Sequence, residues 1–502
     1  MSIPLQRLRD LLPFSRHPAS GGFVSTADGS PNAKSIAWHR VFAHIDDVLL
    51  PQIMRQRGLL QRFRQLEAAC QEAEPALAEI ERQTSAAPLP LPPAVQAATL
   101  QADNLIKRLA QCYGDIVRSV IKRQGSEPVP LFYRAIQRAM AMLARRQLLA
   151  HRACALPSTS SWQQLHALYR TAHDPDLQAL NGDTALIEHE YLGALLLAYL
   201  DPQRLSRGDL DTVHRCAQQL AAYAVVSAAT AEALARQTTE ASFLVRPEDG
   251  HPGLPLSRLK ADSPFAGGLL IDCGQVLAAI DRNISRQPGK PVQPDLAAPP
   301  ALLQSLRVAL GGCSARRFGR ARFRPRADLV GGLGAVIQFL DGNAYTRRAL
   351  DAPGWQNGRP TGEWSLLDES PDGFLVRFVR GEQCRFSAGQ VVVLQPRESS
   401  RTHLCLVRRV VSVRSRLELG LQLLSPQVSI VALPGAGNSR AIFLHSLPAY
   451  GSHAGLITAP RTLRGKQRLT LKIQGHPIER QIGRTLEANG ELELVALEPM
   501  PG

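Results

Sequence analysis

The sequence lacks the short motifs that would assign it to a known catalytic or metal-binding chemistry. No two of its eight cysteines stand at the C-x-x-C spacing of zinc ribbons. It contains no P-loop, no G-x-S-x-G string and no H-E-x-x-H string. We therefore expect no metal, no cofactor and no enzymatic activity, and we expect the scattered cysteines to be reduced, buried thiols.

Long apolar runs are also missing. The longest one, residues 191–200, is far shorter than the roughly 20 residues that a transmembrane helix needs. Near the N-terminus, Arg7, Arg9 and Arg16 interrupt the apolar pieces, so we expect no signal peptide. These absences predict a cytoplasmic protein without a transmembrane segment.

Aromatic residues are few, at 5% of the chain, and 20% of the residues are charged. With 44% hydrophobic residues and a length of 502, the composition is typical of a globular protein of two or three domains. The net charge of +15 admits a nucleotide, a nucleic acid or an anionic membrane surface as partner. A solvated basic surface without a specific partner explains the charge equally well.

Patterning divides the chain into a helical first half and a β-rich second half. Apolar residues recur at three- and four-residue steps from about residue 36 to residue 238, as on amphipathic helices. Within this part, the pattern favours a helix over 208–235. Short apolar runs separated by Gly and Pro follow residue 316 and indicate strands. We expect these strands at 335–340, 363–367, 373–379, 390–394, 403–413, 416–424, 429–433, 441–447, 454–457, 467–473 and 491–497.

The predicted fold class is therefore α+β with several domains. We expect a poorly ordered segment over 1–35, an α-helical domain over 36–286 and a linker with a short helix over 287–315. A small antiparallel β-barrel over 316–433 and an additional β-subdomain over 434–502 complete the chain.

The most informative feature is a cluster of six arginines at the start of the β-rich half. It contains Arg316, Arg317, Arg320, Arg322, Arg324 and Arg326. Guanidinium groups stay charged at any cellular pH and suit bidentate contacts with phosphate and with the guanine edge. Downstream, Asp368-x-Ser370-x-x-Gly373 can offer a carboxylate, a hydroxyl and bare backbone to a planar base. Together the two features predict a site for a doubly charged ligand that contains guanine.

These two motifs resemble those of PilZ domains. Arg316-Arg317-Phe318-Gly319-Arg320 fits the family's R-x-x-x-R motif, and the D-x-S-x-x-G string fits its second motif. Residues 406–410 and 417–426 are similar to the closing strand pair of such barrels. R-x-x-x-R by itself is unspecific here, because Arg320/Arg324 and Arg322/Arg326 match it too. The resemblance covers roughly residues 316–433.

The resemblance implies a bacterial receptor for cyclic di-GMP. It implies that Arg316 and Arg320 clamp phosphate and a guanine edge, with Arg317 as an accessory contact. Asp368 and Ser370 would bind the other guanine edge, and Gly373 would allow close approach. Nucleotide binding is expected to change how the helical region is arranged and how it contacts an unknown protein partner.

One departure from the family and two alternatives stay open. The two motifs are further apart than usual, and residues 341–362 look like an insertion. Both outcomes stay open: the insertion preserves ligand binding, or it abolishes it. The first alternative is a ligand-free, degenerate barrel in a scaffold protein that binds partners through its helices. The second is a basic nucleic-acid-binding protein, which we do not favour because no basic sheet with interleaved aromatic residues is evident.

Overall fold

The structure is a computed structural model, and it describes most of the chain. The described residues are 33–123, 129–174, 184–237, 240–260, 264–286, 292–311, 325–341, 362–381, 386–397, 401–413, 416–425, 427–433, 439–451, 454–463, 467–473 and 476–500. They form two compact units. The first unit holds the described residues up to Cys313 except for Ala87–Pro92 and Gln203–Asp209, which belong to the second unit with the residues from Ser314 onward.

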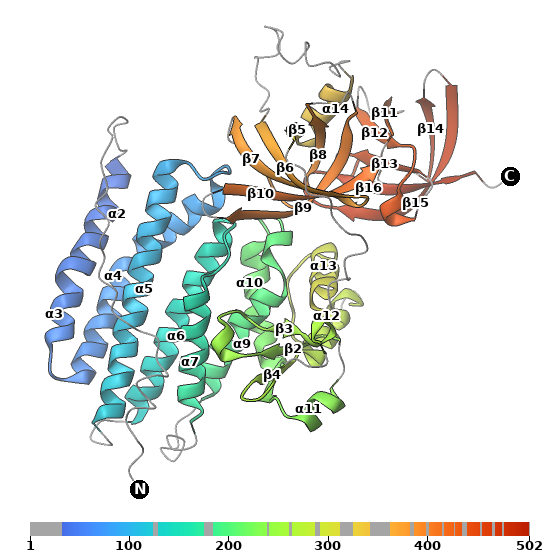
Figure 1. The fold of residues 1–502 in the computed structure, drawn as a ribbon. Helices are drawn as coiled ribbons and strands as arrows, with labels where there is room; N and C mark the ends of the chain where they lie inside the picture. Colours follow the sequence, from blue (N-terminus) through green and yellow to red (C-terminus); the bar gives the residue numbers. More distant parts are fainter. Residues whose placement is uncertain are drawn as a thin grey trace. The chain divides into compact units, whose positions relative to one another are not determined.

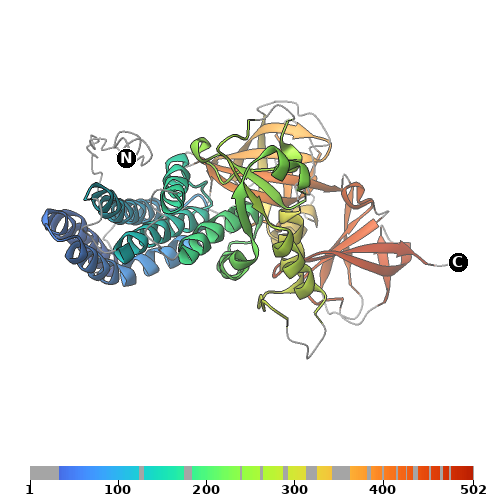
Figure 2. The ribbon, with the colours of Figure 1, turned by 90° about the horizontal axis from the view of Figure 1, so that it is seen from below.

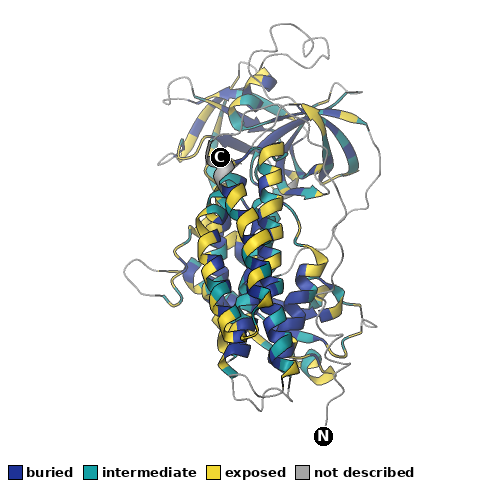
Figure 3. Ribbon diagram, turned by 90° about the vertical axis from the view of Figure 1, so that its left-hand side faces the viewer, coloured by how far each residue is buried: buried dark blue, intermediate teal, exposed yellow. Residues whose placement is uncertain are grey.

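Helices form most of the first unit (Figure 1). They are α2 (Ala33–Ala43), η1 (His44–Leu49), α3 (Leu50–Arg55), α4 (Leu59–Ala86), α5 (Pro93–Lys122), α6 (Val129–Arg152), α7 (Thr159–Ala172), α9 (Ala185–Tyr199), α10 (Leu210–Leu220), η3 (Ala221–Tyr223), α11 (Ala231–Arg236), η4 (Pro247–Asp249), η5 (Leu256–Arg258), α12 (Gly274–Ile284) and α13 (Pro300–Leu310), with η2 (Pro202–Arg204) at the boundary between the units. Buried and exposed residues alternate along the helices, as amphipathic sequences require (Figure 3).

A ladder of ion pairs joins two of these helices. Arginines on α6 and glutamates on α4 both recur every seven residues, which is two helical turns; they are Arg138, Arg145 and Arg152 with Glu67, Glu74 and Glu81. Arg138 Nε donates to Glu67 Oε1 at 2.7 Å, and Arg145 Nε donates to Glu81 Oε1 at 2.6 Å. Arg145 and Glu81 are only 18% and 12% exposed. The ladder therefore fixes the register of the two helices at charges that are largely removed from water.

The first unit also contains a small antiparallel sheet that the sequence pattern did not indicate (Figure 2). Its strands are β1 (Val225–Ala228), β2 (Ser242–Val245), β3 (Leu254–Pro255) and β4 (Leu269–Asp272), in the order β1-β4-β2-β3. The predicted continuous helix over 208–235 is therefore wrong between η3 and α11, where β1 interrupts it. The helical periodicity ends at Leu220, and the β-branched pair Val225 and Val226 extends along β4 instead.

The second unit begins with a closed six-stranded barrel (Figure 1). Its strands are β5 (Arg326–Gly331), β6 (Gly362–Ser370), β7 (Gly373–Gly381), β8 (Val391–Pro396), β9 (His403–Val413) and β10 (Arg416–Ser425). Their order around the barrel is β10-β7-β6-β5-β8-β9, and every neighbouring pair is antiparallel. Closure leaves this sheet without an open edge.

A second sheet of six strands packs on the barrel within the same unit. It consists of β11 (Val428–Ala432), β12 (Arg440–Leu444), β13 (Ala454–Thr458), β14 (Arg468–Ile473), β15 (His476–Ala488) and β16 (Glu493–Pro499), in the order β11-β12-β13-β16-β15-β14, with η7 (Pro448–Tyr450) between β12 and β13. The helix α14 (Leu333–Asp341) shares one hydrophobic core with both sheets, and its Phe339 belongs to the same cluster as Val393 of β8 and Ile442 of β12. The second sheet and α14 therefore share a core with the outer face of β8 and β9.

This architecture confirms the predicted fold class: a helical region, then an antiparallel barrel, then additional strands. The strand predicted over 335–340 is wrong, because these residues form α14. Val336, Ile337, Phe339 and Leu340 are buried at helical spacing, and a short apolar run suits a buried helix as well as a strand. The six cysteines among the described residues are buried and form no disulfide, as expected.

Candidate functional site

The outer surface of the barrel has two different sides. On the inner side of the strands, large apolar residues such as Trp364 and Phe374 form the barrel's own core. On the outside, β8 and β9 are covered by α14 and the second sheet, with Val393 and Leu406 buried in the shared core. The outside of β5, β6, β7 and β10 instead carries polar and charged residues. This second side is where a polar ligand could reach the barrel.

A basic groove of about 680 Å³ lies on that side. It is lined by Pro90, Arg326, Ser365, Leu367, Arg377, Phe378, Val379, Arg416 and Leu417. Three of these residues are arginines from three different strands, and none of the described lining residues is acidic. Its volume is within the range of sites for nucleotide-sized ligands, and a cleft lined by one sign of charge concentrates ions of the opposite sign.

Two carboxylates, those of Glu418 and Glu363, bind arginines around this groove. Arg377 donates from Nη2 at 2.6 Å and from Nε at 2.9 Å, and both bonds go to Oε1 of Glu418. Glu363 faces Arg380 Nε at 2.7 Å, Arg397 Nη1 at 3.4 Å and Arg326 Nε at 3.5 Å. One carboxylate that is shared among three guanidinium groups cannot neutralise them all.

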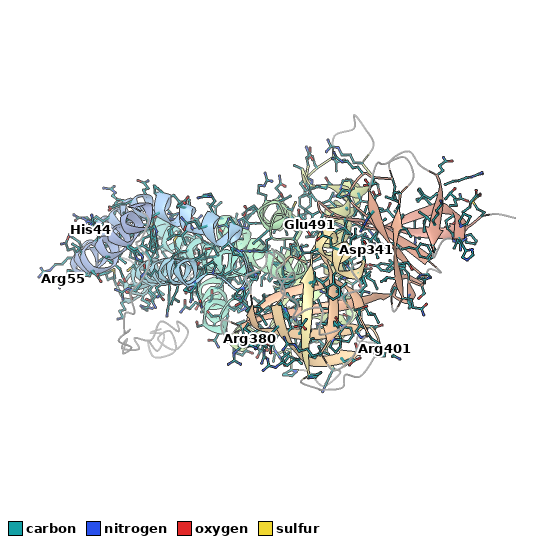
Figure 4. The ribbon with its side chains drawn as sticks, turned by 90° about the horizontal axis from the view of Figure 1, so that it is seen from above. His44, Arg55, Asp341, Arg380, Arg401 and Glu491 are labelled. Atoms are coloured by element: carbon teal, nitrogen blue, oxygen red, sulfur yellow. The ribbon has the colours of Figure 1, made fainter. Side chains whose placement is uncertain are left out.

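Electrostatics at Glu363 follow from this crowding. The hydrogen bond from Arg380, and then the positive charges of Arg397, Arg380 and Arg326, hold the pKa of Glu363 below its ordinary value. Arg380 itself projects from the barrel into solvent and is 78% exposed (Figure 4). Glu363 therefore stays ionised to a lower pH than an ordinary glutamate and anchors the basic face.

The hairpin between β6 and β7 carries the D-x-S-x-x-G residues. Ser370 pairs with Gly373 across a turn at Pro371 and Asp372. Up to Leu366, which pairs with Val376 of the barrel core, the outward residues of β6 are those with odd numbers, such as Ser365. A bulge at Leu367 adds one residue, so that Asp368 pairs with the outward Leu375. Because partners across a ladder share a face, the bulge turns Asp368 and Ser370 to the groove side.

Gly373 is required by the barrel itself. Its φ of +149° lies in a region that residues with a side chain rarely adopt, and an added Cβ would lie 1.9 Å from the carbonyl oxygen of Leu421 on β10. Gln422 is its cross-strand partner on that strand. The glycine therefore allows β7 to approach β10 closely, which is a structural role in addition to the approach of a ligand that the sequence suggested.

The structure brings together three of the six predicted site residues. Asp368, Ser370 and Gly373 lie on one hairpin, where the Ser370 hydroxyl donates to the Gly373 carbonyl oxygen at 3.3 Å. Arg316, Arg317 and Arg320 lie outside the described residues. The chain is described again from Pro325, whose carbonyl oxygen accepts a hydrogen bond from the Leu366 amide at 3.0 Å. The described start of β5 thus lies beside the bulge that precedes Asp368.

Sequence reasoning missed the residues that line the groove. Arg377 and Arg416 were not predicted as site residues, and Arg326 was named only as a member of the arginine cluster. The sequence pattern indicates part of this site, because Arg377 and Arg416 each stand next to a buried residue in a strand with alternating polar and apolar positions. Their convergence depends on the order of the strands around the barrel, which a single sequence does not reveal.

Two further classes of site find no support in the part of the chain that the structure describes. No group of three or more His, Cys, Asp or Glu side chains is placed there to hold a metal ion. None of the helices within the described ranges combines the length and apolar character that crossing a bilayer requires.

Comparison with known proteins gives one match. Residues 44–232 match the model of a family described as "Cyclic-di-GMP receptor FimW, N-terminal domain". The matched part begins at η1 and ends in α11, so most of it belongs to the helical unit. No curated protein and no solved structure matches the chain. The relation to cyclic di-GMP receptors that the barrel motifs suggested thus finds support in another part of the chain, and the assignment of the barrel to PilZ domains stays a prediction.

Proposed function

We propose that this protein is a receptor for cyclic di-GMP and that the nucleotide binds on the open side of the barrel. The observation that carries the proposal is the bulge at Leu367, because it turns Asp368 and Ser370 to the same side as Arg326 and Arg377. A hydrogen-bonding edge and an arginine-lined groove then adjoin, as a ligand with a guanine base and two phosphates requires. The match of residues 44–232 to the receptor family supports the choice of ligand.

The roles of the residues follow from their chemistry. Arg316 and Arg320 clamp a phosphate and the guanine edge, and Arg317 adds a further charge. Asp368 and Ser370 accept and donate hydrogen bonds at the other guanine edge. Gly373 has no side chain, so the ligand can approach the backbone of the hairpin closely. Arg320 precedes Pro325, the residue before β5, by five positions in the sequence. We propose that this short connection lets the side chain of Arg320 contribute to the ligand site.

We further propose that ligand binding is transmitted to the helical unit. Arginines that repel one another without ligand become neutralised by the phosphates, and the segment before β5 then adopts a single arrangement. A ligand shifts a conformational equilibrium only as far as it binds the two arrangements with different affinity. The helical unit would present its surface to a protein partner in one arrangement and withhold it in the other.

A bacterial cytoplasm is the compartment that we propose for the receptor. Six buried cysteines among the described residues form no disulfide, which favours a reducing environment. The proposal assigns the protein a binding role and no catalytic step.

Isothermal titration calorimetry at physiological salt tests the proposal. We expect saturable binding of cyclic di-GMP and no comparable binding of GTP or cyclic AMP. Since a hydrogen bond to a charged group contributes about 1.5–3 kcal/mol, Arg320→Ala should weaken binding by at least about tenfold and leave the melting temperature nearly unchanged.

Arg322→Ala is the matched control, because it removes the same charge from the same arginine run. We expect it to change the affinity by less than about twofold, because the predicted clamp consists of Arg316 and Arg320 and not of Arg322. Equal losses in the two variants would indicate a non-specific electrostatic attraction and would argue for the nucleic-acid alternative. Absence of both heat and thermal shift at high ligand concentration would indicate a degenerate barrel.

A further inference from the structure

The groove contains a charged pair whose geometry differs from that of a structural salt bridge. Arg377 projects outward from β7 between Ser365 on β6 and Glu418 on β10. Both of its hydrogen bonds go to one oxygen of Glu418. A bidentate pair would instead place two donors on two oxygens, which is the stronger arrangement. Arg377 is 34% exposed at its side chain, so a ligand in the groove can reach the guanidinium group.

The balance of charges around the groove is positive. Five arginines face four carboxylates on this side of the barrel, which leaves an excess of one positive charge; they are Arg326, Arg377, Arg380, Arg397 and Arg416 with Asp328, Glu363, Asp368 and Glu418. Asp328 and Glu363 pair with Arg397 and Arg380, Glu418 pairs with Arg377, and Arg416 is exposed. A phosphodiester group, which carries one negative charge, complements this excess.

We propose that Arg377 is a phosphate contact of the ligand site and that Glu418 is an internal competitor which occupies Arg377 until the nucleotide binds. The proposal rests on the proposed function and deepens it. In the free protein, Glu418 neutralises Arg377 through a single oxygen. In the complex, two phosphate oxygens accept the two donors of Arg377, and Glu418 is released toward solvent. Affinity for the ligand is thereby lowered by the strength of the internal pair.

The same geometry explains why the competitor can yield. Glu418 stands on β10 directly opposite Arg377, so either side chain can turn away without any change in the backbone ladder. Glu418 is 15% exposed and stands at an outward position of β10. Release of the carboxylate therefore requires only a change of rotamer.

Opposite effects of two variants test the proposal. We expect Arg377→Gln to weaken the binding of cyclic di-GMP by about tenfold, since one charged contact is lost. We expect Glu418→Gln to strengthen binding by about threefold or more, because the amide competes poorly for the guanidinium. Arg377→Lys should fall between wild type and Arg377→Gln, since it keeps the charge without the planar fork. Arg468→Gln, on an exposed position of β14 in the second sheet, is the matched control and should leave the affinity unchanged.

The design separates the outcomes. If Arg377 and Glu418 form only a structural pair, both variants lower the melting temperature and neither changes the affinity, or both weaken it together; either result overturns the proposal. If the wild type binds cyclic di-GMP and Arg377→Gln binds it with the same affinity, this inference is overturned and the proposed function stays intact. Absence of wild-type binding overturns both. Melting temperatures measured alongside identify a variant that fails to fold, and Glu418→Gln, which keeps the shape of the side chain, then decides alone.

Discussion

Arginines have different surroundings in the two units of this protein. In the helical unit, Arg145 is 18% exposed and is shared between Glu74 and Glu81 on the neighbouring helix. In the barrel, Arg326 is 48% exposed and its nearest carboxylate oxygen is 3.5 Å away on an already shared Glu363. The first arrangement saturates a buried charge, and the second leaves charge available to a ligand. The number and burial of an arginine's partners therefore distinguish structural from binding arginines better than local density in the sequence does.

The largest expected effect is at Gly373. This residue stands in the hairpin between β6 and β7 that carries Asp368 and Ser370 on the binding side of the barrel. We expect Gly373→Ala to lower the free energy of unfolding by roughly 3 kcal/mol or more, since the added Cβ would collide with the Leu421 carbonyl and the φ is unfavourable. Chemical denaturation of the full chain measures the loss. Gly451→Ala is the control: its φ is +63°, but no atom lies within 4 Å of an added Cβ. We expect it to cost only about 1 kcal/mol. Equal losses would show that the close approach to β10 is unimportant.

Acid should weaken the helical unit through its buried histidines. Burial lowers the pKa of His166 and of His151 to about 4. Between the ordinary pKa of about 6.5 and that value, the unfolded chain binds a proton that the folded chain does not. These histidines therefore leave the free energy of unfolding unchanged above pH 6.5. Below that pH they lower it by up to roughly 1.4 kcal/mol per pH unit for each histidine.

His166→Gln sharpens this prediction. His166 joins the Tyr191 hydroxyl at 2.8 Å and the His251 carbonyl oxygen at 2.9 Å, so the variant lowers stability at neutral pH. The slope of the unfolding free energy against pH between 6.5 and 4 should nevertheless become shallower than in wild type. An unchanged slope would show that His166 does not titrate differently in the folded and unfolded chains.

The ion-pair ladder gives the smallest of these effects. We expect Arg145→Gln to lower the free energy of unfolding by about 2 kcal/mol, because it strands the partly buried Glu81 beside a single remaining arginine. Affinity for cyclic di-GMP should not change. Arg82→Gln on α4 removes an arginine that is 69% exposed and should have no measurable effect on stability. A loss of ligand affinity in Arg145→Gln would break the division of roles between the two units.

Strong periodicity and turn residues made much of this fold predictable. The long amphipathic helices and most barrel strands occur where the apolar pattern placed them, since burial of one face fixes both. β5 was missed because Arg326 and Asp328 give it a charged outward face next to the arginine run. β15 was missed because most of its residues are exposed or only half-buried, so it shows no strict alternation of apolar and polar residues. Both strands depend on their neighbours in the sheet for their stability.

The candidate site was predictable only in outline. The D-x-S-x-x-G string indicated the hairpin, since a two-residue turn between strands is a local property. The bulge at Leu367 could not be foreseen, because nothing in the string Leu366-Leu367-Asp368 indicates an extra residue. Without that bulge, the alternation of β6 would direct Asp368 to the barrel interior. Convergence of Arg326, Arg377 and Arg416 likewise requires the strand order of the closed barrel.

Hydrogen–deuterium exchange with and without cyclic di-GMP tests most directly whether the barrel, rather than the helical unit, holds the ligand. We predict that saturating nucleotide slows amide exchange in peptides that cover residues 365–377 and 416–422, on the side of the barrel that carries the groove. The same protection should be weaker in Arg320→Ala at equal ligand concentration. Slowed exchange confined to residues 44–232, with the barrel strands unchanged, would contradict the account and assign the ligand to the helical unit.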